Sequence, residues 1–430
     1  MKLLTTPPRG MRDVLPDEVD LRDRTLATIL HVYRSRGFVR IETPAVESLE
    51  LLTRGEGGEN EKLIFKILKR GQRLETARET EELADLGLRF DLTVPLARYY
   101  ANNHARLPNP LKAIQIGPVW RAERPQHGRF RQFTQCDIDI LGVRSEIAEI
   151  ELILATADAL LALGLDDLTV RINDRRLLAS VARRCGFEEA RFDSVFIALD
   201  KLDKVEAAGV VNELIEGGHP GPAVSALMAL LDESTGADFT PARLAQQLGD
   251  VVDEAVGPAL TRIIDTVTEA GGRRFRVAFD PSLVRGMSYY TGPIFEIRHG
   301  RAASSIAGGG RYDRMIGKLL GRDVPATGFS IGFERVIGIL IERAGAGLEG
   351  HAKTAIVFDE DTRHLEAVLA MARELWDDGR IVLLELKAKR FGKQLAELVS
   401  RGFGRVVVFD AEGRARDADL GPRSERERLA

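Results

Sequence analysis

Residues 120–139, WRAERPQHGRFRQFTQCDID, predict the fold and the site of this chain more directly than any other stretch. Four arginines fall within eleven residues: Arg121, Arg124, Arg129 and Arg131. Two aspartates follow them, Asp137 and Asp139. Because the formal net charge of the whole chain is −4, these arginines are a local concentration of positive charge and not part of a general basic field. This order predicts a site that holds an anion at one end and a cation at the other. The alternative is a solvated hairpin tip with isolated ion pairs.

Alternation around this stretch predicts a long antiparallel hairpin. One strand covers 112–123, a second covers 130–139, and the six turn-like residues 124–129 separate them. Because successive side chains of a strand point to opposite faces, one face of the hairpin collects the polar residues. That face carries Gln115, Gly117, Val119, Arg121, Glu123, Arg131, Phe133, Gln135, Asp137 and Asp139.

Composition places the chain among soluble globular proteins. Its 430 residues are enough for two to four domains, at roughly 150 residues each. The two cysteines, Cys136 and Cys185, form no CxxC pair, which argues against a disulfide scaffold or a zinc site and favours a reducing cytoplasm. The N-terminus has no apolar signal core, and no apolar run approaches the roughly 20 residues that span a bilayer. We therefore expect a cytoplasmic protein with no membrane association.

Periodicity divides the chain into a discontinuous core and two further parts. Residues 1–167 and 273–343 contain helices and alternating strands, among them a predicted strand over 88–94. Residues 168–272 show helical patterning and are interpreted as a mostly helical insertion. Apolar strands alternate with helices from 352 onward, which predicts a small parallel α/β domain at 352–430 that ends in a polar tail. The predicted fold class is thus an α+β core on an antiparallel sheet, with a helical insertion and a C-terminal α/β domain.

Other residues of the core add chemistry to the hairpin. Asp91 and Thr93 lie on the polar face of the predicted strand 88–94, where carboxylates could hold an ammonium, an imidazole or Mg²⁺. Salt bridges to nearby arginines are the alternative. Three glycines at 308–310 permit close approach of the backbone to a ligand, and they do not match a Rossmann or P-loop motif. Arg335 falls in the first turn of a predicted helix, where an anionic ligand would compensate its charge.

Six stretches together resemble class II aminoacyl-tRNA synthetases and, within them, the histidyl-tRNA synthetase family. RGMRDVLP (9–16) is similar to the opening signature of that family, GFVRIETPAVE (37–47) to motif 1, residues 120–142 to motif 2, and GFSIGFERV (328–336) to motif 3. LVRGMSYYTGPIFEI (283–297) and GGGRYD (308–313) resemble the two histidine-specific motifs, which are more specific than the class motifs. The resemblance covers essentially the whole chain. It implies a class II synthetase-like core and an anticodon-binding-like C-terminal domain.

The resemblance implies roles for individual residues. For ATP, it implies contacts from Arg121, Glu123, Arg129 and Arg335. For histidine, it implies contacts from Asp91, Thr93, Arg121, Gln135, Asp139, Arg285, Tyr289, Tyr290 and Tyr312. It implies that Arg121 and Arg285 are catalytic, on either side of the α-phosphate, and that Gln126 meets the acceptor end of tRNA. Mg²⁺ would bridge the pyrophosphate oxygens of ATP, with no metal site fixed by the protein alone. A homodimer is implied by motif 1.

The implied activity is that of a histidine–tRNA ligase, with L-histidine, ATP and tRNA(His) as substrates. Two departures from the common pattern stand out: Ser288 where the family commonly has aspartate, and Asp139 where many bacterial members have the longer glutamate. Two alternatives remain open. One is a regulatory subunit resembling that of ATP phosphoribosyltransferase, and the other is an adenylate-forming ligase with a non-tRNA acceptor. The retained arginines and the C-terminal α/β domain favour the ligase over the regulatory subunit.

Overall fold

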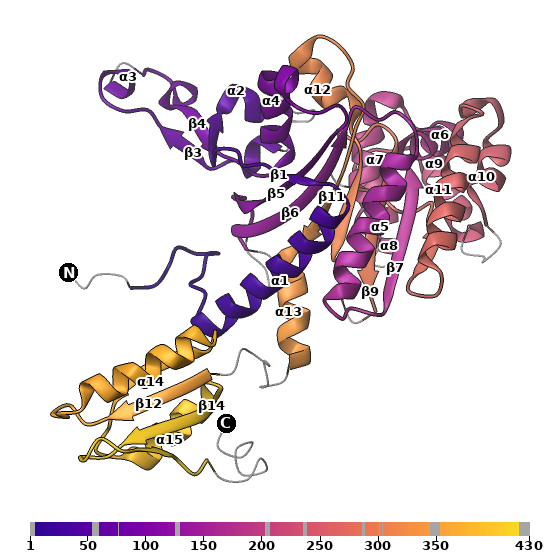
Figure 1. Cartoon of the computed structure of the whole chain (residues 1–430). Coiled ribbons are helices and arrows are strands. Elements are labelled where there is room, and N and C mark those ends of the chain that lie inside the picture. Colours follow the sequence, from indigo (N-terminus) through magenta and orange to yellow (C-terminus); the bar gives the residue numbers. More distant parts are fainter. Residues whose placement is uncertain are drawn as a thin grey trace. The chain divides into compact units, whose positions relative to one another are not determined.

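The computed structural model describes residues 5–53, 60–75, 77–124, 130–202, 207–234, 239–285, 289–300, 302, 304–344 and 353–420. The chain forms two compact units, Met1–Ile339 and Leu340–Ala430 (Figure 1). The first unit is built on an eight-stranded sheet and carries the helical region. The second is a small α/β unit.

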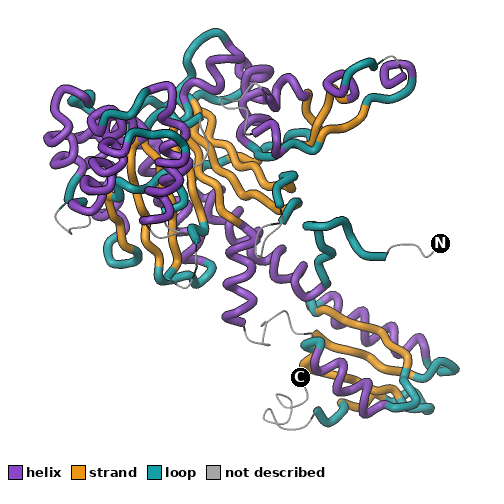
Figure 2. The backbone as a smooth tube through the Cα atoms, turned by 180° about the vertical axis from the view of Figure 1, so that it is seen from behind, coloured by secondary structure: helices purple, strands orange, loops and turns teal. Residues whose placement is uncertain are grey.

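The large sheet is mostly antiparallel, which confirms the predicted fold class. Its order is β1-β5-β6-β11-β10-β9-β7-β8, and only the pairs β1–β5 and β7–β8 are parallel. The strands lie side by side in the view from behind (Figure 2). Their bounds are β1 Val39–Arg40, β5 Leu111–Trp120, β6 Gln132–Leu141, β7 Leu168–Asp174, β8 Arg276–Phe279, β9 Pro293–His299, β10 Ala307–Arg311 and β11 Ala326–Gly332.

The predicted hairpin is the pair β5–β6, and its register places the polar residues on one face. Gln115 lies opposite Asp137, and Gly117 lies opposite Gln135. The row through Asp137 continues across the sheet to Ser330 in β11, Gly308 in β10, Glu296 in β9 and Arg171 in β7. The parallel row through Asp139 runs to Gly328 and Gly310. Because neighbours in register share a face, these rows form one polar floor. The hairpin loop 125–129, with Gln126 and Arg129, lies outside the described residues.

Two helices pack together beside this sheet. Helix α1 (Pro16–Ser35) ends before Gly37, whose φ of 80° is a backbone conformation that favours glycine. Helix α5 (Ile147–Ala162) contacts α1 and lies against β6 and β11. Helix α1 buries Leu21, Ile29 and Tyr33. These helices fill the apolar side of the unit and leave the polar floor for the site.

The predicted strand 88–94 is wrong. The strand in this region is β4 (Ala84–Leu88), which forms a small three-stranded sheet with β2 (Val46–Ser48) and β3 (Lys66–Leu68). Helix α4 then begins at Thr93 and runs to Asn103. The backbone N–H of Val94 donates to the Asp91 carboxylate, so Asp91 satisfies one of the free amides at the start of the helix. Pro95 fits this position because the first turn of a helix does not need its amide.

The helical region begins later than predicted. Residues 168–174 form β7, a strand of the core sheet, in which Leu168, Val170 and Ile172 alternate as buried residues. The helices that follow are α6 Arg175–Cys185, α7 Phe192–Leu199, α8 Ala207–Glu216, α9 Gly221–Glu233, α10 Pro241–Leu248 and α11 Val256–Gly271. The carboxylate of Asp174 accepts from the N–H of Arg176 and so caps α6, which fixes the change from strand to helix. Two further core helices are α12 (Asp313–Leu320) and α13 (Phe333–Ala344).

The C-terminal unit contains the predicted parallel strands and one that the sequence did not suggest. Its sheet has the order β13-β12-β14-β15, with α14 (Leu365–Asp377) and α15 (Phe391–Ser400). The strands are β12 Lys353–Phe358, β13 Ile381–Leu386, β14 Phe403–Phe409 and β15 Ala415–Asp417. Strand β15 pairs antiparallel with β14, so the polar tail was an incorrect prediction for 415–417. The carboxylate of Asp410 accepts from the N–H of Arg414 and closes the connecting turn.

Candidate active site

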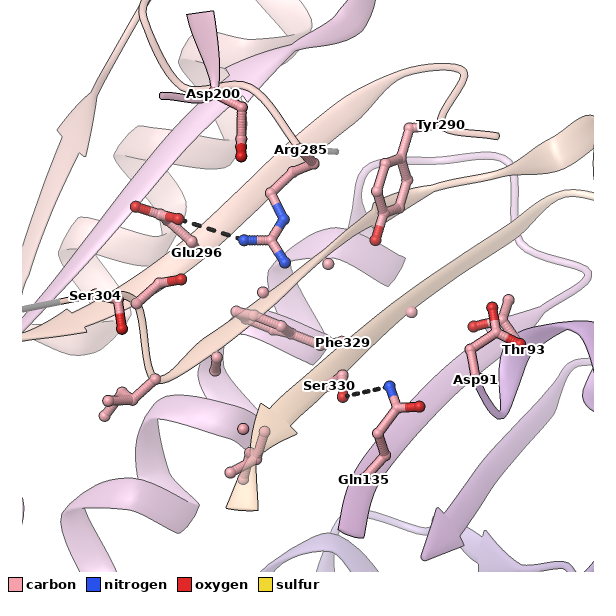
Figure 3. Close-up of a pocket in the computed structure, with 18 of the residues that line it drawn as sticks. Asp91, Thr93, Gln135, Asp200, Arg285, Tyr290, Glu296, Ser304, Phe329 and Ser330 are labelled. Atoms are coloured by element: carbon pink, nitrogen blue, oxygen red, sulfur yellow. Dashed lines mark hydrogen bonds and ion pairs between the residues drawn. The ribbon is translucent and has the colours of Figure 1, made fainter. Parts of the chain in front are cut away.

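A cavity of roughly 580 Å³ lies over the polar floor of the large sheet. Eleven of the thirteen residues predicted for the site line it: Asp91, Thr93, Arg121, Glu123, Gln135, Asp139, Arg285, Tyr289, Tyr290, Tyr312 and Arg335. The other two, Gln126 and Arg129, lie outside the described residues. In the close-up, Asp91 and Thr93 lie together on one side, and Arg285 with Glu296 lies on the other (Figure 3). The cavity thus brings together segments that are up to 272 residues apart, from Leu63 to Arg335.

One side of the cavity is rich in buried carboxylates. The Asp139 carboxylate accepts a hydrogen bond of 2.6 Å from the Tyr312 hydroxyl. Burial raises the pKa of Asp139 to about 7, although that hydrogen bond opposes the shift. Burial likewise raises the pKa of Asp91 to about 6, against the opposing hydrogen bond from the Val94 amide. Both carboxyls are therefore partly protonated near neutral pH, and a bound cation would favour their ionised forms.

Asp137 belongs to the same group, although its sequence pattern predicts no definite role for it. Its side chain is 4% exposed and lines the cavity. Within the described parts of the chain, its Oδ1 atom has no hydrogen-bond partner. Burial, and then the nearby charge of Asp139, raise the pKa of Asp137 well above its usual range. Gln135 completes this side: its amide nitrogen lies 3.3 Å from the Ser330 hydroxyl, to which it donates. These groups form a pocket wall suited to a small cationic ligand.

The glycines of the floor leave the space that the functional side chains fill. A Cβ atom added at Gly328 would lie 3.0 Å from Cγ of Asp139 and 3.3 Å from Cε1 of Tyr312. One added at Gly308 would lie 2.6 Å from Nη1 of Arg285. The glycine run predicted to allow close approach to a ligand therefore also makes room for the residues that would hold it.

Three of the predicted arginines also line the cavity. Arg121 donates from Nε to the Phe90 carbonyl at 3.0 Å, and its guanidinium lies 5.1 Å from the centre of the Phe133 ring. Arg285 donates from Nη1 to Glu296 at 3.4 Å. Arg335 donates from Nη1 to the Ser305 carbonyl at 2.6 Å. Fixed guanidinium groups of this kind bind phosphates well because they remain charged and present planar donors.

Tyrosines form the edge of the carboxylate side. The rings of Tyr289 and Tyr290 lie edge-to-face at 4.8 Å, and Tyr289 lies at 6.0 Å from Tyr312. Burial raises the pKa of all three hydroxyls, so they stay protonated. Protonated tyrosines provide donors and apolar ring surface beside the buried acids.

Several lining residues were missed from the sequence. Glu296 and Glu334 are acids that line the cavity, the first buried and the second half-buried. Each lies in the same predicted motif as an arginine chosen for the site, Arg285 or Arg335, and that proximity was the available signal. Helices α6 and α7 also contribute to the wall, through Arg175 and Phe196. No spacing in the sequence signals that contribution, because it depends on how the helical region packs. In the described ranges, no group of three or more His, Cys, Asp or Glu is placed to hold a metal ion.

An antiparallel sheet whose hairpin leads into Arg121 at the cavity, and which includes a motif 3-like strand and helix, defines a class II aminoacyl-tRNA synthetase core. Comparison with known proteins specifies the family. The family model "Histidyl-tRNA synthetase" matches residues 10–336. The histidine–tRNA ligase of Leifsonia xyli subsp. xyli is 46% identical over 429 residues, which cover 98% of this chain and 99% of the relative. The chain therefore belongs to the histidyl-tRNA synthetase family of aminoacyl-tRNA ligases, as its motifs predicted.

Solved structures agree with this assignment. The crystal structure of histidyl-tRNA synthetase from Nostoc sp. PCC 7120 matches with a TM-score of 0.76 and 27% identity, covering 100% of this chain and 99% of that one. A structure described as an ATP phosphoribosyltransferase regulatory subunit/histidyl-tRNA synthetase from Bacillus halodurans C matches with a TM-score of 0.73 at 24% identity, over 95% of this chain and 99% of the other. That second likeness concerns the fold alone.

Proposed function

We propose that the cavity joins L-histidine to ATP as histidyl-adenylate and then transfers histidine to tRNA(His), releasing pyrophosphate and AMP. One observation carries this proposal: buried carboxylates and arginines line one cavity, with Asp91 and Arg285 on opposite sides of it. An aminoacyl-adenylate carries a cationic amino acid and an anionic phosphate, so its charges match those two sides.

The carboxylate side would hold histidine. Asp91 and Thr93 would meet the α-ammonium, together with Gln135 and Tyr290. Asp139 would bind an imidazole nitrogen while it accepts the Tyr312 hydrogen bond. Tyr289 and Tyr312 would close the imidazole pocket. The buried state of Asp139, which is 3% exposed, supports this role because a charged hydrogen bond is stronger away from water.

The arginine side would hold ATP. Arg121 and Arg285 would lie on either side of the α-phosphate, with Arg121 also binding the histidine carboxylate. Glu123 would lie near the adenine, and Arg335 with Arg129 would bind the γ-phosphate end. Gln126 would meet the acceptor end of tRNA.

The chemistry needs position and charge more than covalent help. The histidine carboxylate oxygen attacks the α-phosphorus, a new P–O bond forms, and the bond to the pyrophosphate oxygen breaks with its electron pair. In the second step, a ribose hydroxyl of tRNA attacks the histidyl carbonyl and AMP leaves. Two preorganised arginines would each contribute about 3 kcal/mol of transition-state stabilisation, by analogy with single oxyanion-hole donors.

Mg²⁺ would neutralise the pyrophosphate that leaves ATP. Oxygen donors of the phosphates themselves are the ligands that this ion prefers. We also propose a homodimer, from the similarity of 37–47 to motif 1, and a cytoplasmic location. None of the helices in the described parts of the chain is both long and apolar enough to cross a membrane.

Histidine-dependent ATP–pyrophosphate exchange, followed by charging of tRNA(His), tests the proposal. Exchange and charging are both expected. Absence of exchange would refute an adenylate-forming activity and favour the regulatory subunit, while exchange without charging would favour a different acceptor. Arg285→Ala should reduce exchange by orders of magnitude while histidine still binds; near-normal exchange would refute its role at the α-phosphate.

A further inference from the structure

Two neighbouring strands of the large sheet, β7 and β9, hold Arg285 in place. It follows a short turn, 280–284, which begins where the N–H of Asp280 donates to the Ile172 carbonyl of β7 at 2.9 Å. Asp280 then accepts from the N–H and hydroxyl of Ser282, and the N–H of Leu283 donates to its carbonyl at 3.0 Å. The turn therefore has a defined shape and a fixed attachment to β7.

Asn173 of β7 supplies the main attachment. Its side chain is 0% exposed, and its amide nitrogen donates to the carbonyls of Pro281 at 3.2 Å and Leu283 at 3.1 Å. Its amide oxygen accepts from the N–H of Asp174 at 2.8 Å. Both amide hydrogens are thus committed to the turn that precedes Arg285. An asparagine in the middle of a core sheet is costly unless it is fully bonded, and here its bonds determine where that turn lies.

Glu296 fixes the far end of the arginine side chain. It lies next to Arg171 in the register between β9 and β7 and is 5% exposed. Its Oε1 accepts from Arg171 at 2.8 Å and from Arg298 at 3.0 Å, while Oε2 lies 3.4 Å from Nη1 of Arg285. Arg171 also pairs with Asp280, so the same arginine links Glu296 to the start of the turn. The dashed line in Figure 3 marks the Arg285–Glu296 contact.

We propose that Asn173 and Glu296 are positioning residues for Arg285, Asn173 through the turn 280–284 and Glu296 through the guanidinium. Asn173 is absent from the residues that line the cavity, so its effect on the reaction passes through Arg285. This inference rests on the proposed contact of Arg285 with the α-phosphate. A shift of about 1 Å in a catalytic group can reduce a rate about 100-fold, so small changes in these attachments matter.

The test is a double-mutant cycle in histidine-dependent ATP–pyrophosphate exchange. Asn173→Asp keeps the shape of the side chain but loses both donors. It should lower kcat about 10- to 100-fold and leave KM for histidine and for ATP within about twofold. In the Arg285→Ala background the same change should lower kcat by less than about twofold, because the residue through which it acts is gone. Asn103→Asp is the matched control: Asn103 donates to the Tyr99 carbonyl outside the cavity, so its exchange kcat should match wild type.

Glu296→Gln provides a second test if Asn173→Asp does not fold, as judged by circular dichroism and thermal unfolding. It should show the same loss of kcat in the wild-type background and the same lack of effect beside Arg285→Ala. Near-normal kcat in the folded Asn173→Asp and Glu296→Gln variants would overturn the proposal, as would losses that multiply with that of Arg285→Ala. Those two outcomes would refute the positioning role of Asn173 and Glu296 but not the role of Arg285 at the α-phosphate. Near-normal exchange by the Arg285→Ala single variant would instead refute the role of Arg285 itself.

Discussion

Gly308→Ala should selectively slow adenylate formation. Gly308 lies in the floor of the cavity, and an added Cβ would lie 2.6 Å from Nη1 of Arg285. Since non-bonded heavy atoms settle at about 3.5 Å or more, the guanidinium would have to move by roughly 1 Å. The obstructing atoms belong to the far end of a flexible side chain, so the fold should tolerate alanine while Arg285 is displaced.

The expected loss follows from that displacement. A 1 Å error in the placement of a catalytic group costs on the order of 100-fold in rate, or about 2.7 kcal/mol. Histidine-dependent ATP–pyrophosphate exchange should therefore show kcat reduced about 100-fold, with KM for histidine within about threefold of wild type. Thermal unfolding should show that the variant remains folded.

Gly338→Ala is the matched control for this prediction. It makes the same substitution in helix α13, where an added Cβ meets no heavy atom within 4 Å. Its exchange rate should equal that of wild type, and its stability should rise slightly because alanine favours a helix more than glycine. A Gly308→Ala enzyme with near-normal kcat would show that Arg285 need not occupy its present position, and would refute the reasoning.

Three further predictions concern the carboxylate side. Gly328→Ala should raise KM for histidine about 10-fold or more with little change in KM for ATP, because the added Cβ displaces Asp139. Equal increases in the two KM values, measured by steady-state exchange, would contradict this. Affinity for histidine should fall as pH is lowered through about 7, since Asp139 must be ionised to bind a cation, and calorimetric titration of Asp139→Asn should show a flatter profile. Asp137→Asn should raise the unfolding temperature more at pH 8 than at pH 5. A carboxyl whose pKa is raised in the folded state binds more protons when folded than when unfolded. Its presence therefore lowers the free energy of unfolding as pH rises above its unfolded pKa of about 3.9. An equal change at both values in a thermal melt would count against that assignment.

The hairpin could be predicted because alternation along a strand determines which face of the sheet each side chain occupies. Once 112–123 and 130–139 are antiparallel strands, Gln135 and Asp139 must share a face with Arg121, and all three residues line the cavity. The glycines at 308–310 could be recognised as a point of close approach because they have no side chains. What alternation cannot give is which strand lies beside which, and the row from Asp137 to Glu296 depends on that order.

The errors came from segments where a local pattern had two explanations. Leu88, Phe90, Leu92 and Val94 alternate like a strand, but the bond from the Val94 amide to Asp91 starts a helix there. In 168–174 the alternation of apolar residues was present, yet Arg171 and Asn173 between them resembled the polar side of a helix. Those two polar residues are buried or half-buried because they bond to the Arg285 turn and to Glu296. Their partners lie more than a hundred residues away, so no local pattern could reveal why a sheet would contain them.

The buried carboxylates of the cavity should also reduce the stability of the empty protein. Asp137 and Asp139 are buried in adjacent rows of the floor, and burial raises the pKa of both because water no longer stabilises their charges. A bound ammonium or imidazole would supply the missing positive partner. Binding then favours ionisation, and the free energy that the empty site lost by burying these acids is recovered only in the complex. That recovery offsets the cost of burying two acids in the sheet, where packing alone would favour apolar residues.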